Sequence, residues 1–498
     1  MQLLLLLSVF VIATCGLIYE LIAGTLASYL LGDSITQFST IIGVYLFSMG
    51  IGSYLSKFIT KNLIGVFIQV EILIGLIGGL SATILFVSFE YVTSFRILLY
   101  GIVCLTGTFV GLEIPLLMRI LEKKYEFKEL VSKVFTFDYI GALLASILFP
   151  LVLVPHLGLV RTAFMFGILN VLVGLWTIFI FKETIPYLRF LKGEAIAILL
   201  VLTAGFVYSD RILSFSESNS YPDTVIYSKS TKYQRMVLTK GPNDLRLFLN
   251  GNLQFSSRDE YRYHEALVHV GLASLTDPKR VLVLGGGDGL AIREVLKYPT
   301  VEKITLVDLD PDMTKLFKGH DALTDLNQDA LSSSKVEIVN EDAFIWLKSN
   351  QVKYDFIIVD LPDPSNFSIG KLYTNTFYQS VKSSMAPAAV VVVQSTSPYV
   401  AKKSFWTVDA TLKSTGLKTT PYHVFVPAFG DWGYIIATAH EFVVPTQLPA
   451  GLKFLNADVV SSMLVFPEDM TVESSQVNKL NNQVLVRIFD EEWANYVQ

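Results

Sequence analysis

The chain has 498 residues, enough for two to four domains, and a formal net charge of −5 at pH 7. Apolar residues make up 52% of it and charged residues only 17%, which is too hydrophobic for a wholly soluble protein. No basic tract is present, so no nucleic-acid partner is expected. The only cysteines, Cys15 and Cys104, lie in apolar runs, which excludes a disulfide framework and a cysteine-based zinc site.

The first 209 residues contain seven apolar runs. Six are long enough to cross about 30 Å of hydrocarbon as helices, which takes roughly 20 residues. The seventh holds only about 15 residues between Glu194 and Asp210, which is marginal for a crossing. We therefore predict a helical membrane domain with six to seven segments. The runs are 3–31, 35–56, 62–89, 97–121, 134–155, 158–181 and 195–209.

Lysine and arginine are concentrated in alternate loops between these runs. Because basic loops stay on the cytoplasmic side of a membrane, the pattern places these loops and the N-terminus in the cytoplasm. Seven crossings would then put the rest of the chain outside the cell, whereas six crossings and a flat interfacial seventh segment would keep it inside. The basic residues are Lys57 and Lys61, then Lys123, Lys124, Lys128 and Lys133, then Lys182, Arg189 and Lys192.

Four acidic residues interrupt the apolar runs: Glu20, Glu71, Glu113 and Asp138. Acids inside a bilayer are costly and often mark a functional site such as a cation path. Glu20 and Glu113, with apolar neighbours on both sides, are the better candidates for that role. The alternative is that these acids face one another, face polar partners in the bundle, or lie at the interface.

The second half of the chain has the pattern of an α/β protein. Residues 224–254 predict short strands with turns at 241–244 and 250–251, and a helix follows at 259–275. From residue 280, nearly continuous apolar strands alternate with helices, which predicts a parallel sheet covered on both faces.

Acidic residues follow four successive strands of this predicted sheet. Gly285-Gly286-Gly287-Asp288-Gly289 lies between a strand and a helix, and the next strand ends in Asp308, where a carboxylate can accept hydrogen bonds from ribose hydroxyls. The following strands end in Glu341-Asp342-Ala343 and in Asp360-Leu361-Pro362-Asp363. Because the carboxyl ends of parallel strands meet at one rim, this pattern predicts a nucleoside site. A dinucleotide fingerprint is less favoured, since its third glycine is missing.

Residues from about 224 to 440 resemble the spermidine synthase (polyamine aminopropyltransferase) family, and the apolar part before them resembles its membrane-bound, multi-span subset. The resemblance rests on YQ at 233–234, LNGNLQFSSRDEYRYHEAL at 249–267, GGGDG at 285–289, VDLD at 307–310, EDA at 341–343 and DLPDP at 360–364. It implies a methyltransferase-like (Rossmann-type) α/β domain after a small β-domain. The expected parts are a transmembrane helical domain at 1–210, a small β-domain with a linking helix at 211–275, the nucleoside-binding domain at 276–440 and a C-terminal extension without assignable motif at 441–498.

The resemblance also implies the activity. An aminopropyl group would pass from decarboxylated S-adenosylmethionine to putrescine or a related amine, giving spermidine and methylthioadenosine, with no permanent cofactor and no metal. Asp360 would be the catalytic base. The other implied roles are Gln234 at the thioadenosine, Gly285 and Gly287 in the nucleoside loop, Asp288 at the aminopropyl nitrogen, Asp308 at the ribose, Asp342 and Ala343 at the adenine, and Tyr263, His264 and Asp363 in the amine channel.

The charges fit this reaction. Asp288 would attract the donor's ammonium group and repel the carboxylate of intact S-adenosylmethionine. The sequence departs from the family in the loop DPSNFSIGKLY at 363–373, where Phe367 stands in place of an expected proline. That loop shapes the acceptor side, so the identity of the amine stays open.

Two other functions are considered beside this one: an S-adenosylmethionine-dependent methyltransferase, and a polyamine transport or sensing protein with a regulatory nucleoside-binding domain. Asp288 and the pair Asp360 and Asp363 disfavour the methyltransferase. The expected partners are the amine, the lipid bilayer and a second copy of the chain in a homodimer. Because the donor is an intracellular metabolite, we expect a multi-pass cell-membrane protein with a cytoplasmic catalytic domain, six crossings and a flat seventh segment.

Overall fold

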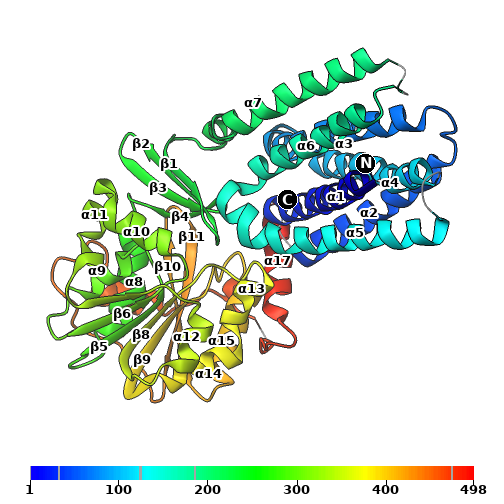
Figure 1. The fold of residues 1–498 in the computed structure, drawn as a ribbon. Coiled ribbons are helices and arrows are strands. Elements are labelled where there is room, and N and C mark those ends of the chain that lie inside the picture. The colour runs from blue at the N-terminus through cyan, green and yellow to red at the C-terminus, as the bar shows by residue number, and fades with distance from the viewer. Residues whose placement is uncertain are drawn as a thin grey trace. The chain divides into compact units, whose positions relative to one another are not determined.

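The computed structural model describes residues 2–31, 34–92, 94–122, 126–183, 185, 187–472 and 475–497. The chain forms two compact units (Figure 1), which we call the helical unit, Met1–Pro222, and the α/β unit, Asp223–Gln498. Lys123 and Lys124 of the second basic loop lie outside the described residues.

Long helices build the helical unit. Six stretches of its described part are long and apolar enough to cross a membrane, and one of them, the 54-residue stretch Phe127–Ile180, contains two helices joined by a short π-helix. Pro150 within that π-helix has no backbone N–H to donate, which is one recognised cause of a break in a helix. The elements are α1 (Gln2–Leu31), α2 (Ser34–Ser56), α3 (Leu63–Tyr91), α4 (Phe95–Leu121), α5 (Phe127–Leu148), η1 (Phe149–Leu153), α6 (Val154–Ile180) and α7 (Leu188–Ser220).

The seventh helix corrects one expectation from the sequence. It begins at Leu188, before the charged residue Glu194, so its apolar stretch Leu188–Ser209 has 22 residues rather than about 15. It also runs along the bundle, because Gln69 Nε2 of α3 donates to Glu194 Oε1 at 2.8 Å and Arg161 Nε of α6 donates to Ser209 Oγ at 2.9 Å. A segment lying flat across one end of the bundle would not make both contacts, so the packing of α7 favours a course along the bundle over the flat seventh segment expected from the sequence.

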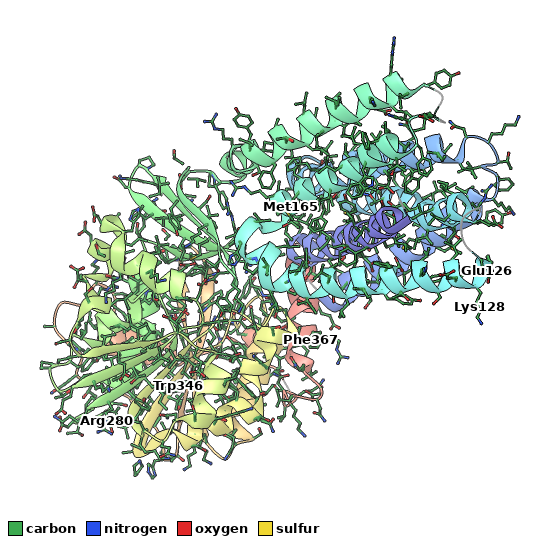
Figure 2. The ribbon with its side chains drawn as sticks, viewed as in Figure 1. Glu126, Lys128, Met165, Arg280, Trp346 and Phe367 are labelled. Atoms are coloured by element: carbon green, nitrogen blue, oxygen red, sulfur yellow. The ribbon has the colours of Figure 1, made fainter. Side chains whose placement is uncertain are left out.

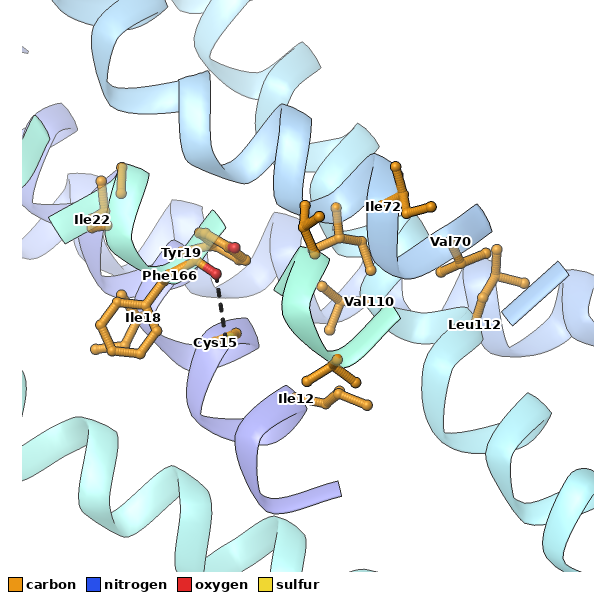
Figure 3. Packing of buried hydrophobic residues seen from close by; sticks show 14 of the residues in the cluster. Ile12, Cys15, Ile18, Tyr19, Ile22, Val70, Ile72, Val110, Leu112 and Phe166 are labelled. Carbon is orange, nitrogen blue, oxygen red and sulfur yellow. Dashed lines mark hydrogen bonds between the residues drawn. The ribbon is translucent and has the colours of Figure 1, made fainter. Parts of the chain in front are cut away.

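The interior of the helical unit is apolar with a polar centre. Around Cys15, Tyr19 and Phe166 the side chains of several helices interlock (Figure 3). Among them, Tyr19 Oη donates to Asn170 Oδ1 at 2.9 Å, and Asn170 Nδ2 donates to Glu71 Oε2 at 2.9 Å.

The buried acids of the bundle thus face polar partners. The Glu71 carboxyl group also lies beside that of Glu113, and both side chains are buried. Glu20, which the sequence favoured together with Glu113 as a candidate functional acid, is only partly buried.

The α/β unit opens with a small antiparallel sheet of strand order β1-β2-β3-β4. Asn250 and Gly251, with φ of 51° and 81°, form the turn between β3 and β4, as expected for an Asn-Gly hairpin. The strands are β1 (Thr224–Ser230), β2 (Arg235–Gly241), β3 (Asp244–Leu249) and β4 (Asn252–Ser256).

A seven-stranded sheet of order β10-β11-β9-β8-β5-β6-β7 forms the centre of the α/β unit. Five neighbouring strands, β9 to β7 in this order, pair in parallel as predicted, but β10 and β11 form an antiparallel hairpin at one edge that was not predicted. The sheet is therefore mixed. Its strands are β5 (Arg280–Gly285), β6 (Lys303–Val307), β7 (Val336–Val339), β8 (Tyr354–Asp360), β9 (Met385–Gln394), β10 (Lys418–Val426) and β11 (Gly430–Thr438).

Helices cover both faces of this sheet, with a separate apolar core on each (Figure 1). One core contains residues of α8, α9, α10, α11 and α16, and the other contains residues of α12, α14, α15 and α17. The helices are α8 (Glu260–Leu272), α9 (Leu290–Val295), α10 (Pro311–Gly319), α11 (Asp321–Asn327), α12 (Ala343–Ser349), α13 (Phe367–Gly370), α14 (Asn375–Ser383), α15 (Lys402–Lys413), α16 (Ala457–Met463) and α17 (Val484–Val497), with short 3₁₀ turns at η2 (Ala330–Ser332), η3 (Lys371–Tyr373) and η4 (Glu468–Met470).

Candidate active site

The glycine loop brings the backbone of β5 close to the ends of β6 and β8. Gly285 has a φ of 80°, and a Cβ placed there would lie 2.0 Å from the Asp360 carbonyl oxygen. A Cβ on Gly287 would lie 2.6 Å from Asp308 Oδ2, the atom to which the Gly287 N–H donates at 3.0 Å. A Cβ atom at either position would clash with these oxygens, so only glycine allows the loop at 285–289 to pass between Asp308 and Asp360.

Asp308 follows β6, and its carboxylate is held by backbone. Besides the Gly287 N–H, the Asp310 N–H donates to its Oδ1 at 2.9 Å. Burial raises the pKa of Asp308 to about 6, against the lowering effect of these backbone hydrogen bonds. The carboxyl group is thus fixed in place and stays responsive to protons near neutral pH.

Asp360 ends β8 and contacts α8. Tyr263 Oη donates to Asp360 Oδ1 at 2.6 Å, and both side chains are partly buried. Burial, followed by repulsion from Asp288, raises the pKa of Asp360 to about 6, although His264 and the Tyr263 hydrogen bond act to lower it. A carboxylate with this pKa can accept a proton at neutral pH and release it again.

His264 is held by an ion pair that was not predicted. Its Nδ1–H donates to Glu260 Oε2 at 2.9 Å, one helical turn away on α8, and Arg293 of α9 donates to both oxygens of Glu260 at 2.9 Å. Burial disfavours the imidazolium, but Glu260, Asp288 and Asp360 outweigh it and raise the pKa of His264. The same contacts lower the pKa of Glu260 to about 2 despite its burial.

Asp288 lies at the start of α9. Its Oδ1 accepts from the Leu290 N–H at 2.9 Å, and its carbonyl oxygen accepts from Asn327 Nδ2 at 2.9 Å. Burial raises the pKa of Asp288, while the nearby His264 lowers it. Asp288, Asp360 and His264 interact with one another electrostatically, so these three predicted residues come together.

Asp363 lies three residues beyond Asp360 and has its own partners. Gln394 Nε2 donates to its Oδ1 at 3.1 Å and Thr396 Oγ1 to its Oδ2 at 3.3 Å. Burial raises the pKa of Asp363 to about 6 against these two hydrogen bonds. Tyr373 interacts electrostatically with both Asp363 and Asp360, so the two acids share this tyrosine as a neighbour.

Gln234 reaches the site through a residue that was not predicted. Its Nε2 donates to Asp310 Oδ2 at 3.0 Å, and Thr231 Oγ1 donates to the same oxygen at 2.7 Å. Asp310 follows Asp308 closely and also caps α10 by accepting from the Asp312 N–H. The small sheet is thereby tied to the end of β6, which places Gln234 beside the predicted ribose acid.

Asp342 and Ala343 begin α12, beyond the end of β7. Asp342 Oδ1 caps this helix by accepting from the Phe344 N–H at 2.8 Å, and its Oδ2 pairs with Lys371 Nζ at 2.6 Å. Ala343 is buried behind it. The acid therefore already has a cationic partner, which the sequence did not suggest.

The structure thus gathers Tyr263, His264, Asp288, Asp308 and Asp360 at one rim of the parallel strands. The residues that sequence reasoning missed are the partners Glu260, Arg293, Asp310, Lys371, Tyr373, Gln394 and Thr396. A spacing of four residues within a helix could have identified Glu260 as the partner of His264. Asp310 lies in the VDLD motif beside Asp308, and Lys371 and Tyr373 lie in the loop at 363–373, but nothing in those motifs marks them as partners. The remaining partners come from distant segments and carry no local signal.

This arrangement suits a cationic ligand that includes a nucleoside. Several partly buried carboxyl groups lie together, and desolvating unpaired negative charge is costly unless a cation or a proton joins it. Among the described residues, His264 is the only cationic side chain that interacts electrostatically with both Asp288 and Asp360. Ammonium or sulfonium groups of a ligand would supply the missing positive charge.

Comparisons with known proteins agree with this chemistry. Residues 260–446 match the family model described as the spermine/spermidine synthase domain. The chain is 52% identical over 493 residues to a polyamine aminopropyltransferase of Leptospira interrogans, covering 99% of both chains, and 52% identical to polyamine aminopropyltransferase 2 of Ralstonia nicotianae, covering 98% of both. Among solved structures, spermidine synthase from Thermotoga maritima matches with a TM-score of 0.46 and 26% identity, covering 49% of this chain and 84% of that one.

Proposed function

This chain belongs to the polyamine aminopropyltransferase family, and we propose that the rim of its parallel strands is where the aminopropyl group is transferred. The protein is an aminopropyltransferase enzyme that uses decarboxylated S-adenosylmethionine as co-substrate and a putrescine-type amine as acceptor, making spermidine. The cluster of partly buried carboxyl groups around Asp360 is the observation that carries the assignment of the site.

The nucleoside part of the donor is proposed to bind along the ends of β5, β6 and β7. Asp308, fixed by two backbone N–H groups, would accept hydrogen bonds from the ribose hydroxyls, with Gln234 beside it. Asp342 and Ala343 would face the adenine. Gly285 and Gly287 would let the backbone approach the thioribose closely, since no side chain intervenes.

The charged end of the donor is proposed to bind near Asp288. Its buried carboxylate would pair with the aminopropyl ammonium, and the same charge would reject the carboxylate of intact S-adenosylmethionine. This rejection disfavours methyl transfer as the function.

The acceptor amine is proposed to enter between Tyr263, His264 and Asp363, with Asp360 as its proton acceptor. The amine nitrogen would attack the propyl carbon beside the sulfonium, so that an N–C bond forms, the C–S bond breaks and methylthioadenosine leaves as a neutral thioether. Asp360 takes the proton that the nitrogen loses, and Tyr263 holds that carboxylate in position. Because the leaving group is already activated, positioning supplies much of the remaining rate enhancement.

We also propose that α1–α7 cross a lipid bilayer. Large apolar side chains point outward from this unit, among them Ile97 at 74% and Phe179 at 77% exposure, while Glu71, Glu113 and Asn170 are buried inside. An apolar exterior around a polar centre suits a lipid environment and would not suit water. The enzyme would therefore be a multi-pass membrane protein.

Substitution of Asp360, at the end of β8, and of Asp363, in the loop after it, tests the proposal that Asp360 is the catalytic base. In the full-length enzyme, Asp360→Asn is expected to lower kcat by roughly 10²–10⁴-fold, the usual contribution of a general base, with donor affinity nearly unchanged. The exposed Asp325→Asn serves as a control and is expected to keep full activity. A severe loss for Asp363→Asn beside a mild loss for Asp360→Asn would show that the two roles are reversed.

A further inference from the structure

The loop that follows Asp360 closes on itself beside both acids. We call residues 361–373 the acceptor loop; it contains Asp363, and Phe367 begins its short helix α13 (Figure 2). Tyr373, at its end, places Oη 3.0 Å from the Leu361 carbonyl oxygen and 3.1 Å from that of Pro362. These hydrogen bonds join the two ends of the loop. Tyr373 is also close enough to Asp360 and Asp363 to interact with their charges.

One side chain from the C-terminal extension holds this loop from behind. Asn478 is fully buried, and its Nδ2 donates to the carbonyl oxygens of Tyr373 at 3.0 Å and Gly370 at 3.3 Å. Its Oδ1 accepts from the Leu485 N–H at 3.3 Å, at the start of α17. Both ends of the amide are therefore used, one on the loop and one on the extension.

The backbone of Asn478 extends the same connection to the neighbouring helices. Its N–H donates to Thr411 Oγ1 of α15 at 2.9 Å, and its carbonyl oxygen accepts from the Asn375 N–H at the start of α14 at 3.0 Å. A single buried residue thus joins the acceptor loop to two helices of the sheet and to α17. Such a residue has little freedom to move without breaking several buried hydrogen bonds.

The extension is itself fixed at two other points. Glu492 of α17 accepts from the Lys403 N–H at 2.8 Å and the Ser404 N–H at 3.0 Å, which caps α15. Glu265 of α8 accepts from the backbone N–H groups of Lys453, Phe454 and Leu455 at 2.7 to 3.0 Å. Since Glu265 adjoins Tyr263 and His264 in α8, the extension contacts both the helix and the loop that line the acceptor side.

We propose that the C-terminal extension is a positioning element for the acceptor amine, and that Asn478 sets the shape of the acceptor loop and hence the affinity and length preference for the amine. This inference rests on the proposed function, in which the amine enters beside Asp363. Asn478 touches neither donor nor acceptor and acts through Tyr373. Within the described part of the chain, no hydrogen bond joins the donor residues Asp288, Asp308 and Gln234 to the extension.

Steady-state kinetics with the full-length enzyme test the proposal. Asn478→Ala is expected to raise the KM for putrescine about 5- to 100-fold, as losing buried hydrogen bonds does, and to reduce the preference between diamines of four and five carbons. The affinity for methylthioadenosine, measured by calorimetry, is expected to stay within about twofold. Asn456→Ala is the control, because Asn456 lies in the extension and its side chain caps α16 by accepting from the Val459 N–H.

A second pair of variants keeps the proposal testable if Asn478→Ala fails to fold. A Cβ on Gly370 would lie 2.8 Å from Gln483 Oε1 and closer still to Val486 Cγ2 of α17, so Gly370→Ala should push the loop away from the extension. Val486→Ala removes the nearer obstacle. The Gly370→Ala enzyme is expected to show the raised putrescine KM, and the double variant is expected to regain at least half of the loss.

The outcomes separate this inference from the function on which it rests. An unchanged putrescine KM in active Asn478→Ala enzyme, or equal losses for donor and amine, would overturn the positioning role. So would the absence of any rescue by Val486→Ala. A wild-type enzyme that transfers no aminopropyl group would instead overturn the proposed function itself.

Discussion

Three carboxyl groups of the site, Asp308, Asp360 and Asp363, have pKa values of about 6 because burial raises all three. Each is held by hydrogen bonds, yet none of these bonds comes from a fully charged side chain. Of the cationic side chains in the site, Arg293 and His264 pair with Glu260, and Lys371 pairs with Asp342. The site thus keeps its negative charge available for cationic substrates.

Asp288 gives the sharpest test of how the donor is recognised. Asp288→Asn is expected to weaken binding of decarboxylated S-adenosylmethionine by about 1.5–3 kcal/mol, the usual loss for a charge-assisted contact. Methylthioadenosine lacks the aminopropyl arm, so its affinity should change little. Calorimetry on both ligands measures the difference. Equal weakening of the two would show that Asp288 shapes the loop rather than binding the ammonium.

We predict that Asp308 makes nucleoside binding depend on pH. Its pKa of about 6 means that the carboxylate, which accepts hydrogen bonds well, is replaced by the neutral acid as the pH falls below 6. The protein without ligand then binds the extra proton, so the affinity for methylthioadenosine should fall with decreasing pH and level off above about 7. This ligand carries no charge near neutral pH, which leaves the protein as the source of the effect.

Titration calorimetry between pH 5 and 7.5 measures this dependence. The expected slope approaches a tenfold loss of affinity for each pH unit below the pKa. Asp308→Asn is expected to bind weakly at every pH with most of the slope gone, while Asp363→Asn is expected to keep the slope. An affinity of the wild-type enzyme that is flat across this range would contradict the assignment of Asp308 to the ribose.

At the scale of elements, the sequence predicted what depends on local pattern. Apolar strands followed by acids were enough to place Asp308 and Asp360 at one rim, because parallel strands end on the same side of a sheet. The antiparallel edge hairpin of β10 and β11 was not found. No strands were predicted from the sequence at Lys418–Val426 and Gly430–Thr438, whose pairing with β9 depends on the finished sheet.

The start of α7 was misjudged for a different reason. Lys192 and Glu194 interrupt the apolar run, and counting hydropathy alone ends the segment there. A helix tolerates such charges when a partner meets them, and Gln69 of α3 donates to Glu194 within the bundle. No window of the sequence contains that partner, since 125 residues separate the two.

The C-terminal extension shows the limit of sequence reasoning most clearly. Asn478 reaches Tyr373 and Gly370 across 105 and 108 residues, and nothing in its neighbourhood in the chain suggests either contact. The residues of the candidate site lie in short motifs, so their chemical roles can be predicted from residue type and spacing. The residues that position those motifs are defined by the fold alone.

At the scale of the whole molecule, the path of α7 determines the sides on which its two ends lie. Because α7 runs from Gln69 of α3 to Arg161 of α6, we expect it to cross the bilayer with the other six helices of the unit. Its two ends then lie on opposite sides of the membrane. The basic residues of the loop before α7 favour the cytoplasmic side for that loop. The α/β unit after α7 needs a donor that is made in the cytoplasm, so both cannot be satisfied at once.

We predict that the α/β unit faces the cytoplasm and that the loop before α7 faces outward. The preference of basic loops for the cytoplasm only biases how the helices insert into the membrane. An enzyme without access to its donor would have no activity at all, and a donor with two positive charges does not cross a bilayer unaided. In a background with Cys15 and Cys104 changed to serine, Ser230→Cys should resist a membrane-impermeant thiol reagent in intact cells and react after lysis. Glu183→Cys should react in intact cells. Protection of both positions would mean that α7 does not cross the membrane, and labelling at Ser230 in intact cells would overturn the cytoplasmic placement.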